Sequence, residues 1–232
     1  MKFSAVAFDL DGTLYPNFRL NIRLIPFLLK DQRLLRAMGT ARERMRKYGG
    51  NYPEDLQGRD FYEIQAVIMA EILGKPAEKV REETERLIYR GWEPLFKNIR
   101  LFPFVRETLD AFRNKGLKLG LLSDFPPETK LVHLKADGYW DTVLCSEETG
   151  YLKPDKASFL DLAEKMKTPP DCILYVGNSI RCDVAGAGRA GMKTALIRSG
   201  LKRYCPLAGG SRKDHPDFVF HDYRQLHDYV LG

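Results

Sequence analysis

The arrangement of apolar and polar positions divides this chain into three stretches. A short apolar run over residues 3–8 predicts one buried strand at the start. Residues 17–96 repeat apolar positions at the helical period, as at Ile64, Val67 and Ile68, and prolines separate the expected helices. From residue 97 onward, short apolar runs alternate with amphipathic segments. We therefore expect an all-helical domain at 17–96, inserted after the first strand of a core formed by residues 1–16 and 97–232.

The alternation after residue 97 predicts an α/β fold. The expected helices cover residues 104–114, 128–136, 156–166 and 183–190, with a last helix ending at Leu231; the expected strands cover 117–122, 142–145, 172–176, 194–197 and 218–220. Such alternation is typical of a parallel sheet with helices on both faces, in three layers. Ligands of these sheets bind beyond the carboxyl ends of the strands. The residues that follow each strand are therefore the first candidates for chemistry.

Two carboxylates follow the first expected strand. Asp9 and Asp11 stand two residues apart and precede Gly12, which permits a sharp turn. Side chains at i and i+2 of a strand point to the same side, so we expect both carboxylates in one site. Because two carboxylates repel each other there, we also expect a hard cation such as Mg²⁺ to offset the repulsion. Asp9 is then a candidate nucleophile toward phosphorus, and Asp11 a candidate acid and base. The plain alternative is a pair of solvated carboxylates at a strand end.

Polar residues follow three further expected strands. Ser123 and Asp124 offer a hydroxyl and backbone N–H groups that can bind phosphate oxygens, or they only cap a helix. Lys153 can offset the negative charge of a phosphate, although a lone lysine usually lies on the surface. Asn178 and Asp183 can complete the oxygen ligands of Mg²⁺.

The composition limits the class of protein. With 44% hydrophobic and 29% charged residues, the 232-residue chain can form a full core and shows no bias toward disorder. It has neither an apolar stretch long enough to span a membrane nor the pattern of a signal peptide, so we expect a cytoplasmic protein with no membrane partner. Four dispersed cysteines without a C-x-x-C pair predict reduced thiols rather than a zinc site or disulfides.

The net charge of +6 raises the possibility of nucleic-acid binding. Basic residues concentrate over residues 30–47, but leucines and methionines recur there at helical spacing. We interpret this run as the solvated face of a helix and expect no nucleic-acid partner; a weaker alternative is attraction of an anionic substrate. The segment 199–217, rich in glycine, proline and charge, predicts a surface loop to which we assign no function.

Taken in order, these motifs resemble those of the haloacid dehalogenase (HAD) superfamily. The resemblance rests on Asp9-x-Asp11-Gly12-Thr13, Ser123, Lys153-Pro154 and Gly177-Asn178-Ser179-x-x-x-Asp183, each at an expected strand end. It spans nearly the whole chain and implies a Rossmann-like core. The helical block at 17–96 is then similar to the cap of the first type in that family.

The resemblance also implies catalytic and metal-binding roles. Asp9 resembles the nucleophile and a metal ligand, and Asp11 resembles the acid and base, whose backbone carbonyl also contacts Mg²⁺. Lys153 resembles the lysine that neutralises charge, and Asp183 the second acid of the metal motif. Asn178 stands where phosphatases of the family commonly carry an aspartate, so we expect a lower metal affinity than is usual there.

For phosphate binding, the resemblance points to the two turns after the first and second expected strands. Thr13 and Ser123 look like the phosphate-binding side chains, with Gly12 and Asp124 in the same turns. The side chains that enter the cap, Tyr15, Asn17, Arg19 and Arg23, are candidates for contact with the leaving group, or they pack the hinge.

These features together predict a Mg²⁺-dependent phosphatase that acts on a small phosphorylated metabolite through an aspartyl phosphate. Asp11 argues against a dehalogenase, because family dehalogenases typically lack the second aspartate and a departing halide needs no proton. A phosphomutase is a further alternative without a feature to support it. A phosphoryl-binding or regulatory protein with weakened catalysis stays open because of Asn178.

Overall fold

Six parallel strands form the central sheet of the protein. The computed structural model describes residues 2–200 and 215–232. The strands are β1 (Ala5–Phe8), β2 (Lys118–Ser123), β3 (Thr142–Cys145), β4 (Ile173–Gly177), β5 (Lys193–Ile197) and β6 (Phe218–Phe220), in the order β3-β2-β1-β4-β5-β6. At the centre of the sheet, Ala7 of β1 lies opposite Gly120 of β2 and Tyr175 of β4. The predicted α/β class with a parallel sheet is confirmed.

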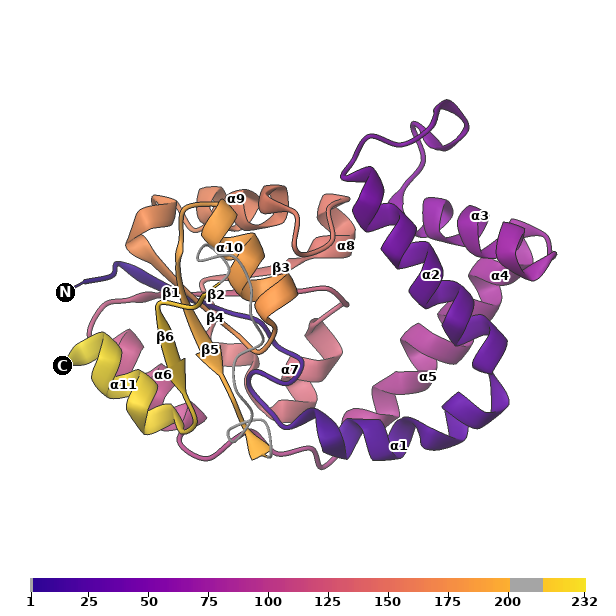
Figure 1. Ribbon diagram of the computed structural model, residues 1–232. Helices are drawn as coiled ribbons and strands as arrows, with labels where there is room; N and C mark the ends of the chain where they lie inside the picture. The colour runs from indigo at the N-terminus through magenta and orange to yellow at the C-terminus, as the bar shows by residue number, and fades with distance from the viewer. Residues whose placement is uncertain (1, 201–214) are drawn as a thin grey trace.

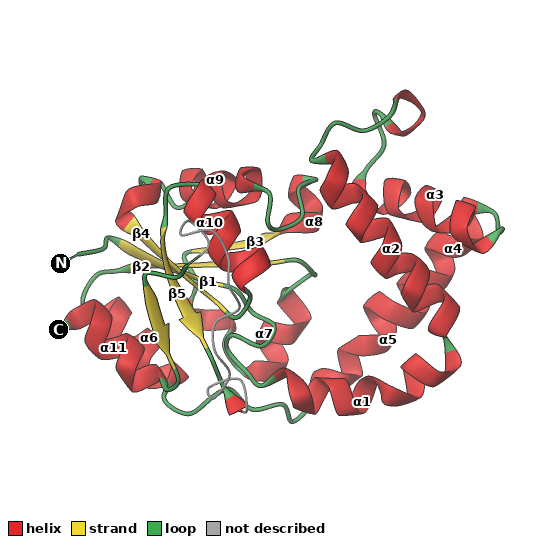
Figure 2. Ribbon diagram, in the orientation of Figure 1, coloured by secondary structure: helices red, strands yellow, loops and turns green. Residues whose placement is uncertain are grey.

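Helices cover both faces of this sheet (Figure 2). They are α6 (Val105–Asn114), α7 (Glu128–Leu134), α8 (Ser146–Thr149), α9 (Lys156–Lys165), α10 (Ala185–Arg189) and α11 (Tyr223–Leu231), with short turns η4 (Asp137–Tyr139), η5 (Pro170–Cys172) and η6 (Ile180–Val184). Because side chains alternate along β1, Val6 and Phe8 pack in one apolar cluster with α6 and α11. Ala5 and Ala7 pack in another, with α9 and α10. The core therefore has three layers.

The structure differs from the sequence prediction after β4. The single helix predicted over 183–190 is a π-helical turn, η6, followed by the short helix α10. The turn widens because the N–H groups of Asp183 and Val184 both donate to the carbonyl of Ser179. Helix α8 was not predicted, since four residues are too few to show a helical period.

Residues 17–96, which we refer to as the cap, form only helices and lie beside the sheet (Figure 1). They are α1 (Asn17–Lys30), α2 (Gln32–Tyr48), η1 (Glu54–Leu56), α3 (Phe61–Leu73), α4 (Ala77–Thr84), η2 (Glu85–Tyr89), α5 (Arg90–Trp92) and η3 (Glu93–Phe96). Local chemistry sets the start of α3, where Asp60 and Glu63 cap each other's backbone N–H groups, and Gly74 ends the helix with a positive φ. The cap has its own apolar cluster, in which Met38 of α2 packs near Ile64 and Ile68 of α3.

The remaining sequence predictions concern membrane segments and thiols. Along the described residues, no helix has the length and apolar character needed to cross a membrane. Cys145, Cys172 and Cys182 are free thiols, as expected. Cys205 and most of the predicted surface loop at 199–217 lie outside the described residues.

Candidate active site

The motif residues meet at the carboxyl ends of β1, β2 and β4. Asp9 directly follows β1, and its backbone N–H donates to the carbonyl of Val176 at 2.9 Å, which extends the pairing with β4 by one residue. Ser123 is the last residue of β2. Asp183 reaches the same edge from η6, which begins three residues after β4 ends. The fold thus brings together residues that are far apart in the sequence.

The Asp9 carboxylate is buried between a hydroxyl and an ammonium group. Thr13 Oγ1 donates to Asp9 Oδ2 at 2.6 Å, and Lys153 Nζ donates to Asp9 Oδ1 at 2.6 Å. Burial raises the pKa of Asp9 to about 7, although Lys153 lowers it, and the charge of Asp183 raises it further. One carboxylate of this site is therefore held in place, with both oxygens hydrogen-bonded.

Lys153 supplies the positive charge of the cluster. The residue is only 3% exposed, and Nζ lies 2.9 Å from Asp183 Oδ1 as well as 2.6 Å from Asp9. Burial disfavours the ammonium form, but the carboxylates of Asp183 and Asp9 raise the pKa of Lys153 well above its usual value. Two buried carboxylates thus share one ammonium group, which leaves the cluster with a net negative charge.

Asp11 occupies a different place from the one predicted. Strand β1 ends at Phe8, so Asp11 lies in the following turn, and the argument from a shared strand face was wrong. Its carboxylate accepts hydrogen bonds from Tyr15 OH at Oδ1 and from Lys130 Nζ at Oδ2. Burial and the charge of Asp11 raise the pKa of Tyr15 well above its usual value, so this phenol stays a proton donor.

Sequence reasoning missed Lys130 as a site residue. It lies on α7, and its Nζ is 2.6 Å from Asp11 Oδ2. The ammonium group also lies 5.3 Å from the ring centroids of Phe96 and Phe125. The local sequence of an amphipathic helix does not distinguish a lysine that contacts a carboxylate from one on the surface. Only the packing of α7 against the turn after β1 reveals it.

Gly12 is required by its backbone conformation and its neighbours. Its φ of +86° lies in the region that favours glycine. A Cβ atom there would overlap the side-chain amides of Asn178 and Asn17. Both amide nitrogens face the same carbonyl: Asn178 Nδ2 donates to the Asp11 carbonyl at 2.7 Å, and Asn17 Nδ2 does so at 3.3 Å.

The predicted metal ligands carry hard oxygen atoms, and Asp9 and Asp183 both contact Lys153 Nζ. The Asp183 Oδ2 atom accepts from the backbone N–H groups of Asn178 and Ser179 at 3.1 and 3.0 Å. The described residues contain no metal-binding group of three or more acidic, cysteine or histidine side chains. The available oxygen donors are instead the carboxylates of Asp9 and Asp183 and the Asp11 carbonyl. The Asn178 amide faces that carbonyl with its nitrogen, so it would offer Oδ1 there only after a half-turn of the amide. This oxygen set, with its net negative charge, fits Mg²⁺.

Ser123 and Asp124 lie in the turn after β2. Ser123 Oγ accepts from the N–H of Phe125 at 3.2 Å. The Asp124 carboxylate accepts from Ser146 Oγ at 2.5 Å and from the N–H of Lys153 at 3.1 Å. Burial raises the pKa of Asp124, but Lys153 and other cations outweigh it and lower that pKa overall. Its side chain therefore holds the backbone of Lys153, and phosphate binding at Asp124 stays a prediction for its backbone N–H.

Two arginines of the basic run on α2 contact the core. Arg42 is 5% exposed, pairs with Glu147, and donates to the Asp124 carbonyl at 2.6 Å. Arg46 donates to the Lys153 carbonyl at 2.8 Å and to Asp124 Oδ2 at 3.0 Å. The interpretation of this run as a solvated face was wrong for these two side chains. The helical period alone could not show which polar residues meet a second domain.

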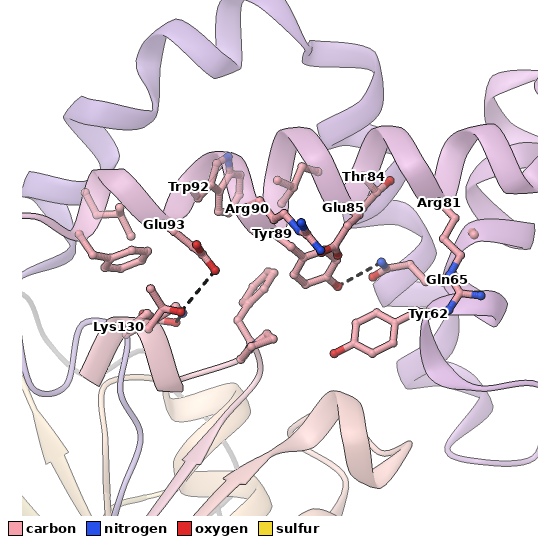
Figure 3. A pocket seen from close by; sticks show the side chains of 18 of the residues that line it. Tyr62, Gln65, Arg81, Thr84, Glu85, Tyr89, Arg90, Trp92, Glu93 and Lys130 are labelled. Atoms are coloured by element: carbon pink, nitrogen blue, oxygen red, sulfur yellow. Dashed lines mark hydrogen bonds and ion pairs between the residues drawn. The ribbon is translucent and has the colours of Figure 1, made fainter. Parts of the chain in front are cut away.

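A cavity of about 1110 Å³ opens between the cap and the core. Asp11 and Lys130 line it from the core side, and Tyr62, Tyr89 and other cap residues line it from the opposite side (Figure 3). Of the four candidates at the cap entrance, Asn17 lines the cavity, and Tyr15 holds Asp11.

The other two cap-entrance candidates do not line this cavity. Arg23 donates to the carbonyls of Leu95 and Lys97, where the chain leaves the cap. The guanidinium of Arg19 lies over the ring of Phe18, which is itself exposed. Arg23 therefore packs the hinge.

Comparison with known proteins agrees with this geometry. Residues 3–191 match a family described as haloacid dehalogenase-like hydrolase. The chain is 29% identical to a glyceraldehyde 3-phosphate phosphatase of Methanopyrus kandleri, over 97% of this chain and 96% of the relative. It is 30% identical to a phosphoglycolate phosphatase of Vibrio vulnificus, over 99% and 97%.

Solved structures share the fold over their full length. A HAD phosphatase from Thermococcus onnurineus matches with a TM-score of 0.61 at 24% identity, covering 99% of this chain and 98% of that one. A 2-haloacid dehalogenase from Pseudomonas syringae pv. Tomato matches with a TM-score of 0.65 at 21% identity, covering 98% of both. One fold thus accompanies both phosphatases and dehalogenases, so the chemistry has to be argued from the site.

Proposed function

We propose that this chain, which belongs to the haloacid dehalogenase-like hydrolase family, is a Mg²⁺-dependent phosphatase of small phosphomonoesters. The phosphatases among its relatives support a phosphoric ester as substrate. The observation that carries the proposal is the pair of differently held carboxylates. Asp9 is buried between Thr13 and Lys153, whereas Asp11 lines the cavity between cap and core.

In this proposal, Asp9 is the nucleophile. A carboxylate oxygen of Asp9 bonds to phosphorus as the bond from phosphorus to the leaving oxygen breaks, which gives an aspartyl phosphate. Lys153 is charged and reaches the same carboxylate, so it can offset the negative charge of the phosphoryl oxygens. Thr13 and Ser123 hold hydroxyl groups at the same edge of the sheet for phosphate binding.

Asp11 is the proposed proton carrier. It gives a proton to the leaving alcohol, and it later accepts a proton from the water that attacks phosphorus and releases phosphate from Asp9. Tyr15 and Lys130 fix both oxygens of its carboxylate, so the group keeps one orientation at the floor of the cavity.

Mg²⁺ would be held by Asp9, Asp183, the Asp11 carbonyl and Asn178. Bound there, the ion supplies the positive charge that draws the phosphoryl oxygens toward Asp9. One ammonium group, that of Lys153, contacts two buried carboxylates, so a net negative charge remains. This remaining charge would attract a cation.

A dehalogenase is the second candidate, because haloacid dehalogenases share the fold. The arrangement around Asp11 favours phosphoryl transfer over it. An alkoxide needs a proton when it leaves and a halide does not, and the two hydrogen bonds to Asp11 position a group for that transfer. Asn178 leaves open a phosphoryl-binding protein with little turnover.

The test is hydrolysis of p-nitrophenyl phosphate with and without Mg²⁺. We expect Mg²⁺-dependent turnover that falls by about 10³-fold or more in Asp9→Asn, since the nucleophile is lost. Asp161→Asn, which changes a half-buried aspartate on α9 outside the candidate site, is the matched control and should keep full activity. Activity that survives Asp9→Asn, or chloride release from 2-chloropropionate at a higher rate, would overturn the proposal. Absent turnover with tight phosphate binding would favour the binding protein.

A further inference from the structure

The cavity above Asp11 is large for a small leaving group. Its volume of about 1110 Å³ slightly exceeds the roughly 300–1,000 Å³ of pockets that enclose drug-sized ligands. A two-carbon alcohol needs on the order of 100 Å³, a few times the ~30 Å³ share of a water molecule. Since Asp11 lines this cavity and is the proposed acid, the leaving group has to occupy it.

Aromatic rings of the cap, together with Phe125 of the core, form part of the cavity wall. The ring of Tyr62 lies 5.5 Å from that of Tyr89, and the ring of Phe125 lies 6.3 Å from Tyr89 and 6.2 Å from Trp92, centroid to centroid. In Figure 3, Tyr62 and Tyr89 lie on one side of the pocket and Lys130 on the other. Such rings favour a flat ring of the ligand, because a base stacks on an aromatic side chain.

The charges that line the cavity do not suit a carboxylate. Its three cationic side chains each have an acidic partner: Arg81 pairs with Asp60 and Glu63, Arg90 with Glu85, and Lys130 with Asp11. The lining also includes Glu78, Glu82 and Glu93. Among the described residues that line the cavity, a carboxylate on the leaving group would thus meet several like charges and no cation without an acidic partner.

Gln65 offers a polar contact at the aromatic side. It is 2% exposed, its Nε2 donates to Tyr89 OH at 3.2 Å, and Tyr89 OH donates in turn to Glu147 at 3.0 Å. These bonds fix the amide, and among the described residues its Oε1 has no hydrogen-bond partner. A buried acceptor without a partner is costly, so a ligand donor beside it would be favourable.

We propose that the leaving group is a ring-bearing alcohol without a carboxylate, of the size and chemistry of a nucleoside. Its ring lies against Tyr62 and Tyr89, and an N–H or O–H group donates to Gln65. This inference rests on the proposed phosphatase function and makes it more specific. It also separates this chain from the two relatives described above, whose names refer to glyceraldehyde 3-phosphate and phosphoglycolate.

The experiment compares kcat/KM for adenosine 5′-monophosphate and phosphoglycolate at saturating Mg²⁺. We expect at least about a tenfold preference for the nucleotide, the equivalent of ~1.4 kcal/mol. An equal or higher value for phosphoglycolate would overturn the inference. If p-nitrophenyl phosphate is then still hydrolysed in an Asp9-dependent way, the phosphatase function stands; without any such hydrolysis, the function itself fails.

Three variants locate the effect in the cavity. Tyr62→Leu and Gln65→Met should each lower kcat/KM for the nucleotide by about tenfold, mainly through KM, because they remove contacts to the bound ring. Tyr62→Phe, which keeps the ring, should retain most of the activity. Tyr48→Leu is the matched control, since Tyr48 is a cap aromatic residue outside the cavity lining. Equal effects of Tyr48→Leu and Tyr62→Leu would contradict the placement.

Discussion

Lys130 Nζ lies 2.6 Å from Asp11 Oδ2, although the two residues are 119 positions apart in the sequence. With Tyr15 on the other oxygen, this contact fixes the carboxylate that we propose as proton carrier. Because Lys130 acts through Asp11, we regard it as a positioning residue.

Replacing Lys130 should therefore lower the rate of the chemical step. We expect Lys130→Met to reduce kcat by about 10- to 100-fold, to change KM less, and to shift the pH profile of kcat, since Asp11 loses its neighbouring charge. Lys130→Arg should restore part of the activity. Lys156→Met, at an exposed position, is the control. An unchanged pH profile in Lys130→Met would show that the contact is only structural.

Asn178→Asp should raise the affinity for Mg²⁺. The amide now donates to the Asp11 carbonyl at 2.7 Å, whereas a carboxylate there would repel that oxygen unless a cation lay between them. Titration of activity with Mg²⁺ should give a half-saturating concentration at least several-fold lower. Asn114→Asp, which adds the same charge on an exposed helix end, should leave it unchanged. Equal values for Asn178→Asp and the wild type would count against a metal-ligand role for this position.

Gly12→Ala should impair both stability and activity. The φ of +86° disfavours a side chain, and the new Cβ would overlap Asn178 and Asn17. We expect a loss of about 1–3 kcal/mol in the free energy of unfolding and a clear fall in kcat, because the turn holds Asp11 and Thr13. Gly138→Ala, where a Cβ meets no atom within 4 Å, is the matched control in denaturant unfolding. Similar losses in both variants would argue against the strain.

The buried pair of Arg42 and Glu147 should stabilise the contact between cap and core. Arg42→Met would leave Glu147 buried without its charge partner, which typically costs about 3–5 kcal/mol. Arg44 lies on the same helix and pairs with Glu71 in an exposed position, so Arg44→Met should change stability by less than about 0.5 kcal/mol. The double variant Arg42→Met, Glu147→Met should recover much of the loss. Full additivity in this cycle would contradict the coupling.

The stability of the metal-free protein should depend on the protonation of Asp9. Its pKa is about 7 in the folded state against an ordinary 3.8, so the folded state binds more protons between these values. The free energy of unfolding should consequently fall, through this group, as the pH rises from about 4 to about 7. In EDTA, the Tm of the wild type relative to Asp9→Asn should drop by several degrees over that interval. A constant difference would mean that Asp9 does not titrate there.

Most of the core fold could be predicted from the sequence, because a local run of apolar residues marks each strand. Strand β3 and strand β6 have the predicted bounds, and β1 begins two residues late. The turn after β1 was harder: Asp11 follows Phe8 by three residues, and nothing local shows that the strand has ended before it. Contacts between distant segments were the least predictable, since Lys130 and Arg42 differ from surface residues only in what packs against them.

The bonds of Arg46 extend from the cap into the centre of the site. This arginine holds the carbonyl of Lys153 at 2.8 Å and the carboxylate of Asp124, which in turn accepts from the N–H of Lys153. An outward movement of α2 would have to break both bonds of Arg46, and it would free the carbonyl of Lys153, while the N–H of Lys153 would stay bonded to Asp124. The carbonyl carbon of residue 153 is thus a natural reporter of the position of the cap, readable by NMR without a label in the cap itself.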